Sequence, residues 1–149
     1  MYKKHKKYIL VIFIISVLSY LLLKPKLLNL VFEIISINAI FLTVYTLSLG
    51  GLISNEKLCK NLSNEEDNEI NKKSKLGIIM SYYKIGYISC LLSVLLVYII
   101  KILEFNNNRI IGYILQILLF GSFCLLNINF IITNYILKFI FNFQTRRFN

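Results

Sequence analysis

The sequence predicts an all-α, polytopic membrane protein in which four transmembrane helices form an antiparallel bundle. Of the 149 residues, 57% are hydrophobic and 16% are charged, and the mean hydropathy is +0.68. A soluble domain of this length carries more charge and shorter apolar runs. Four long apolar runs follow one another, and they lack the alternating polarity of outer-membrane barrel strands. We therefore treat residues 1–149 as a single membrane domain.

The first apolar run, about residues 8–23, follows a basic head and ends at Lys24-Pro25-Lys26. Pro25 cannot continue the hydrogen-bond ladder of a helix, and the two lysines resist the hydrocarbon. The run is near the lower limit of roughly 17–25 residues for a span. A basic head before an apolar run is also the form of a secretory signal peptide. Because no small-residue cleavage site follows Leu23, we expect the helix to be retained.

Three further runs, about residues 27–53, 76–103 and 110–137, are each long enough to cross a hydrocarbon core of roughly 30 Å. They are too long and too apolar for ordinary buried helices. The first of them is joined to residues 8–23 by the Lys-Pro-Lys turn, and the last two are joined by a short asparagine-rich turn. Short turns predict antiparallel neighbours in a compact bundle.

Two polar segments lie outside the apolar runs. The loop at about residues 54–75 is predicted to be cytoplasmic and solvated, although Ser63 and Glu66 match a capping box at which a short helix would begin. The tail, residues 138–149, mixes cations with phenylalanines. This tail is predicted either to lie along the inner membrane interface or to be the frayed end of the last helix.

The formal net charge of +10 is placed mostly at the ends of the apolar runs. The excess of lysine and arginine on one side predicts a multi-pass protein of the cell membrane with both termini in the cytoplasm. No nucleic-acid recognition motif accompanies the charge, so the predicted partner is a bilayer with anionic headgroups rather than nucleic acid. The abundance of Lys, Asn and Ile suggests a bacterial genome rich in A and T. The predicted headgroup contacts are Lys3, Lys4, Lys6, Lys7, Arg146 and Arg147.

Glu33 is the polar residue that most needs explaining, because it lies about 9–10 Å of helix inside the second run. A carboxylate at that depth costs a few kcal/mol unless it is paired, protonated or hydrated. Ser36 shares its helical face, and Gln116 and Ser93 fall in a similar layer of other helices. We predict a polar cluster of Glu33, Gln116, Ser36 and Ser93. Interhelical hydrogen bonding is the favoured role, and a proton or cation site is the alternative.

Enzyme signatures are missing from the sequence. There is no P-loop, G-x-S-x-G or H-E-x-x-H motif, and the single histidine and three dispersed cysteines predict neither a metal site nor a disulfide. We therefore expect no catalytic activity, no cofactor and no metal. The predicted function is that of a non-enzymatic interaction, accessory or immunity-type protein that binds another membrane protein or a second copy. The alternative is a small oligomeric transporter or channel using Glu33.

Overall fold

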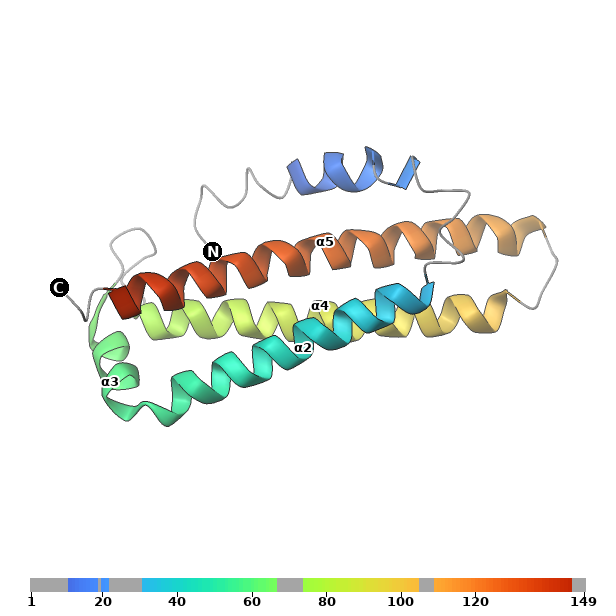
Figure 1. The fold of residues 1–149 in the computed structure, drawn as a ribbon. Coiled ribbons are helices and arrows are strands. Elements are labelled where there is room, and N and C mark those ends of the chain that lie inside the picture. The colour runs from blue at the N-terminus through green and yellow to red at the C-terminus, as the bar shows by residue number, and fades with distance from the viewer. Residues whose placement is uncertain (1–10, 19, 22–30, 67–73, 105–108, 146–149) are drawn as a thin grey trace.

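The computed structural model describes residues 11–18, 20–21, 31–66, 74–104 and 109–145. Within them the chain is all-α, as predicted: α2 (Val31–Ser54), α3 (Glu56–Asn64), α4 (Lys75–Leu103) and α5 (Arg109–Thr145) follow an N-terminal helical segment at residues 11–18 and 20–21. Figure 1 shows α2, α4 and α5 as an elongated bundle, with α3 at one end and the N-terminal segment alongside α5.

Three helices in the described part of the chain are long and apolar enough to cross a membrane: α2, α4 and residues Ile110–Phe141 of α5. Four spans were predicted, and the difference is the run at 8–23. Only residues 11–18 and 20–21 of that run are described, and they do not reach the length of a span by themselves.

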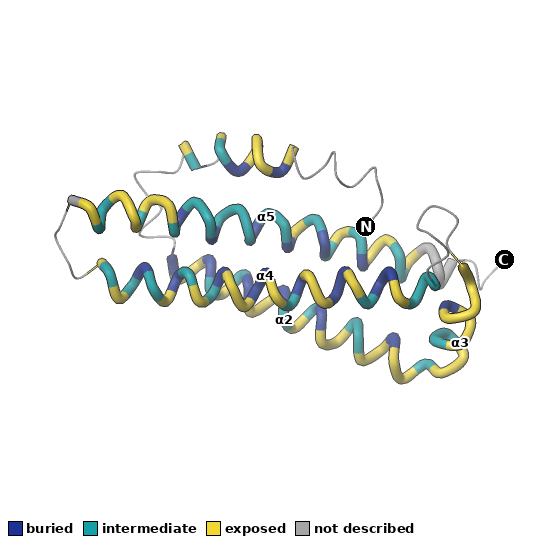
Figure 2. The backbone as a smooth tube through the Cα atoms, turned by 180° about the vertical axis from the view of Figure 1, so that it is seen from behind, coloured by how far each residue is buried: buried dark blue, intermediate teal, exposed yellow. Residues whose placement is uncertain are grey.

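The apolar side chains of these helices point outward to a large extent. In the most apolar stretch of each span, only 28%, 33% and 22% of the residues are buried inside the bundle. Figure 2 shows exposed residues recurring along the outer sides of all three helices. A water-soluble fold would bury such residues, since the hydrophobic effect favours removing apolar surface from water. The outward apolar surface therefore indicates a membrane location.

Helix α4 lies between α2 and α5 and packs against both. Gly86 allows a close approach of α4 to α2, because a Cβ at this position would stand 2.7 Å from Cε2 of Tyr45. The Tyr45 ring is fully buried and meets the rings of Tyr83 and Tyr87 at centroid distances of 6.4 and 5.8 Å. Phe41 packs edge-on against Phe130 of α5. Aromatic packing thus joins α2 to both of its neighbours.

The polar segment after α2 contains α3, where the sequence favoured a solvated loop. Asn55 begins this helix, because its side-chain oxygen accepts the backbone N–H of Leu58 and so satisfies a free helix-start donor. Ser63, the predicted helix start, lies instead in the last turn of α3. Leu62 is fully buried under the end of the bundle. An ion pair between Lys75 and Glu65 joins the chain after α3 to the start of α4.

The N-terminal helical segment packs along α5. Phe13 and Tyr20 place their rings edge-on against Phe120, with centroids 6.0 and 5.3 Å apart. Ser16 is fully buried and accepts a hydrogen bond of 2.9 Å from the side-chain amide of Asn127. α5 itself continues to Thr145, eight residues past the predicted end at 137, because no proline or glycine interrupts it there.

Candidate functional site

A network of hydrogen-bonded polar side chains lies in the core of the bundle. It joins α2, α4 and α5 in the middle of their lengths, where the surrounding side chains are apolar. Every member except Thr133 is buried. The members are Asn38 and Tyr45 of α2, Ser89 and Ser93 of α4, and Ser122, Asn129 and Thr133 of α5.

Asn38 is the residue that links the three helices. Its side-chain nitrogen donates to the hydroxyl of Ser93 on α4 at 3.0 Å and to the Ile34 carbonyl at 2.8 Å. Its side-chain oxygen accepts from the side-chain amide of Asn129 on α5 at 3.1 Å. Both donors and the acceptor of this fully buried amide are therefore in use.

Asn129 is satisfied in a similar way on α5. Its side-chain oxygen accepts the hydroxyl of Ser89, and its backbone carbonyl accepts the hydroxyl of Tyr45 at 3.1 Å. The hydroxyl of Thr133 lies 2.8 Å from the same carbonyl and 3.0 Å from the Tyr45 oxygen. The buried backbone carbonyl of Asn129 thus accepts side-chain hydrogen bonds in addition to its place in the helical backbone ladder.

Ser93 and Ser122 complete the network between α4 and α5. The Ser93 hydroxyl donates to the Ser122 backbone carbonyl at 3.3 Å, while the Ser122 hydroxyl donates to the Leu119 carbonyl in its own helix at 2.9 Å. Small hydroxyl side chains at this contact let the two helices approach closely. The described hydrogen bonds give every side chain of the network at least one partner.

The chemistry available in this network is hydrogen bonding between neutral groups. It contains amides and hydroxyls but no carboxylate, histidine or lysine. Among the described residues, no cluster of three or more His, Cys, Asp or Glu side chains could hold a metal ion. Such a network can fix how helices pack, but its members do not supply a general base or a charged ligand.

The predicted cluster of Glu33, Gln116, Ser36 and Ser93 is not assembled. Ser93 belongs to the core network, but the other three side chains are exposed on outward faces. Ser36 donates to the Phe32 carbonyl of its own helix at 3.1 Å. The residues predicted to contact lipid headgroups, at positions 3, 4, 6, 7, 146 and 147, lie outside the described part of the chain.

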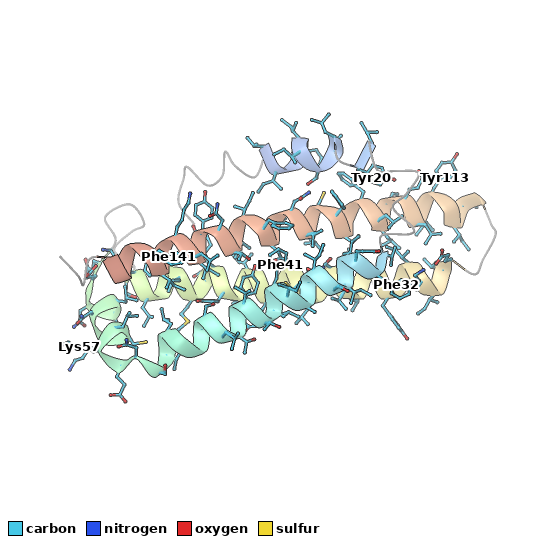
Figure 3. All side chains as sticks on the ribbon, viewed as in Figure 1. Tyr20, Phe32, Phe41, Lys57, Tyr113 and Phe141 are labelled. Atoms are coloured by element: carbon cyan, nitrogen blue, oxygen red, sulfur yellow. The ribbon has the colours of Figure 1, made fainter. Side chains whose placement is uncertain are left out.

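Glu33 lies in the first turn of α2 as described, near one end of the bundle. Lys101, near the end of α4, holds its ammonium 5.0 Å from the centre of the neighbouring Phe32 ring. Figure 3 shows Phe32 at this end of the bundle. The start of α2 is therefore level with the end of α4, so the carboxylate stands near a span boundary and not in its interior.

Asn38 and Asn129 were missed by sequence reasoning, although a periodic signal was present. Tyr45 follows Asn38 by seven residues, and Asn129 follows Ser122 by seven, so each pair lies on one helical face. Comparison with protein-family models, with curated proteins and with solved structures finds no match for this chain. The functional proposal below therefore rests on the geometry of the bundle.

Proposed function

We propose that this chain is a small multi-pass membrane protein that acts without catalysis, as an interaction or accessory partner of another membrane protein. The observation that carries the proposal is the outward face of α2. On that face Ser36, Ala39, Thr43, Thr46 and Gly50 recur at alternating spacings of three and four residues. All five are exposed on the isolated chain.

This α2 stripe, defined as those five residues, has the period of a helix–helix seam. Residues at spacings of three and four form one line along a helix that supercoils with a partner. Small side chains on that line let two helix backbones come close, which is how helices associate in lipid. A Cβ at Gly50 would meet nothing within 4 Å, so the stripe ends in open space.

The outward faces of the other two long helices are different. On α4 the exposed residues past Lys84 are large and apolar, among them Leu91 and Leu95, and on α5 they include Ile117 and Phe130. Such side chains pack readily against lipid tails and hold a neighbouring backbone at a distance. The contrast singles out α2 as the surface for a protein partner.

The hydroxyls of the stripe carry their own hydrogen bonds. Thr43 donates to the Ala39 carbonyl at 2.9 Å and Thr46 to the Leu42 carbonyl at 2.8 Å. Thr46 also pairs with the hydroxyl of the half-buried Tyr87 on α4 at 2.8 Å. These groups are satisfied in the free protein, so lipid exposure costs little, and they can add a bond across an interface when a partner arrives.

A photo-crosslinking amino acid placed along α2 tests the proposal in native membranes. We expect protein adducts at positions 43 and 46 and weaker adducts at positions 40 and 47, because only the first pair lies on the stripe. Position 95 on α4 is the matched control on a lipid-facing surface. Adducts at 43 should disappear in the Gly50→Leu and Ala39→Leu variants. Equal yields at all positions, or adducts that survive both variants, would overturn the proposal.

A further inference from the structure

A cavity opens where α2 passes into α3, against the C-terminal part of α5. Its volume is about 330 Å³, within the range of roughly 300–1,000 Å³ that small-molecule sites occupy. Leu52 and Leu58 line one side and Leu137 and Ile140 the other, so the wall is mostly apolar. It lies at the end of two helices that are long enough to span a membrane. An occupant with a hydrocarbon portion would fit such a wall.

One polar side chain that lines the cavity has an unused donor group. The Asn55 side-chain oxygen caps α3, but its amide nitrogen has no partner among the described residues, and Asn55 lines the cavity. Asn55 is half-buried, so an occupant of the cavity can reach this amide and bring an acceptor oxygen to it.

Three lysines but one carboxylate lie within two residues of the residues that line the cavity. Lys57 and Lys60 of α3 and Lys138 of α5 are exposed and form no ion pair with another described residue, whereas Glu56 is the carboxylate in the first turn of α3. Figure 3 shows Lys57 at the same end of the bundle as Phe141 of α5. Lysines at a membrane boundary attract anionic headgroups.

We propose that this cavity binds one anionic phospholipid. An acyl chain lies along the apolar wall between α2 and α5, a lipid oxygen accepts from the side-chain amide of Asn55, and the lysines of α3 and α5 select a negatively charged headgroup. The proposal goes beyond the proposed function and concerns a different surface from the α2 stripe. The lipid site and the proposed function have only the membrane location in common.

Adjacent glycines provide a matched pair of variants. A Cβ at Gly51 or at Gly50 meets nothing within 4 Å, so the first side-chain atom of a leucine fits at either position. Gly51 lines the cavity and Gly50 does not. Native mass spectrometry of the full chain in detergent would count bound dioleoyl phosphatidylglycerol. We expect Gly51→Leu to weaken retention at least tenfold and Gly50→Leu to leave it within twofold. Full retention by Gly51→Leu would overturn the proposal.

The headgroup is tested with dioleoyl phosphatidylcholine, which has the same chains and no net charge. We expect the wild type to prefer phosphatidylglycerol, and the Lys57→Gln and Lys138→Gln variants each to lose about fivefold of that preference. Lys84→Gln, on α4, is the control and should keep it. Equal binding of the two lipids by the wild type would overturn the proposal. If the wild type binds the lipid but forms no protein adducts at the α2 stripe, only the proposed function would be overturned.

Discussion

Asn129 of α5 donates its side-chain amide to the side-chain oxygen of Asn38 on α2 across 3.1 Å, and both residues are fully buried. Asn38 donates in turn to Ser93 of α4, so one amide pair ties three helices together. Hydrocarbon offers no other partner to a buried amide. Sliding one helix by a turn would leave these groups unpaired, and the network therefore fixes the register of the bundle.

We predict that Asn38 and Asn129 are energetically coupled. Replacing either by Ala leaves the other without its partner and should lower the free energy of unfolding by about 1–3 kcal/mol. The double variant should lose less than the sum of the two single losses, by about 0.6 and at most about 1.7 kcal/mol. Unfolding in mixed micelles, followed by circular dichroism while the denaturing detergent is titrated, gives all four values.

The control for this double-mutant comparison is Asn134→Ala. Asn134 lies on the same helix as Asn129 but is exposed. Its replacement should change the unfolding free energy little and should not couple to Asn38. Coupling of Asn38 with Asn134 as strong as that with Asn129 would mean that the register is not set by this hydrogen bond.

Replacing Gly86 even by alanine is predicted to destabilise the bundle. An added Cβ would stand 2.7 Å from the Tyr45 ring, and that ring is held by hydrogen bonds to Asn129 and Thr133. Gly86→Ala should therefore cost about 1–3 kcal/mol through overpacking, measured in the same micelle titration. Gly112→Ala on α5 is the matched control, since its Cβ meets nothing within 4 Å. Equal losses in the two variants would contradict this explanation.

The side of the membrane that α3 faces follows from charge. The end of the bundle that carries α3 also carries Lys57, Lys60, Lys75 and Lys138, whereas Lys101 and Arg109 lie at the other end. Cytoplasmic ends of spans are rich in lysine and arginine. We therefore expect α3 in the cytoplasm.

An exposed cysteine on α3 can report this orientation. Asn61 is exposed, and Asn61→Cys in a Cys59→Ser background removes the native thiol of that helix. A membrane-impermeant maleimide should label this variant in inside-out vesicles and leave it unlabelled in intact cells. Cys90 is fully buried and serves as an internal negative control. Labelling in intact cells would reverse the assigned orientation.

Hydropathy located the long helices but not their ends. The predicted runs 27–53, 76–103 and 110–137 overlap α2, α4 and α5 over most of their lengths, because apolar content alone marks those stretches. Helix ends depend instead on local backbone bonding. Asn55 starts α3 by accepting one N–H, and nothing in the hydropathy of a polar segment reveals that bond.

The candidate site was harder to predict because hydropathy does not fix how a membrane helix is rotated about its axis. In water the apolar face of a helix must turn inward, but in lipid both faces are apolar. Asn38 and Ser36 lie two residues apart on α2, yet one is buried and the other exposed. Only packing, with Gly86 receiving Tyr45, decides which polar residue faces the core.

Glu33 provides the last prediction, because its position separates the two functions considered for the chain. A transport site would need the carboxylate inside the bundle, but Glu33 is exposed in the first turn of α2 and has no partner among the described residues. We therefore expect liposomes containing the wild type or Glu33→Gln to show the same proton permeability as protein-free liposomes. A proton flux in the wild type that Glu33→Gln abolishes, with assembly intact, would support the transporter function and exclude the accessory role.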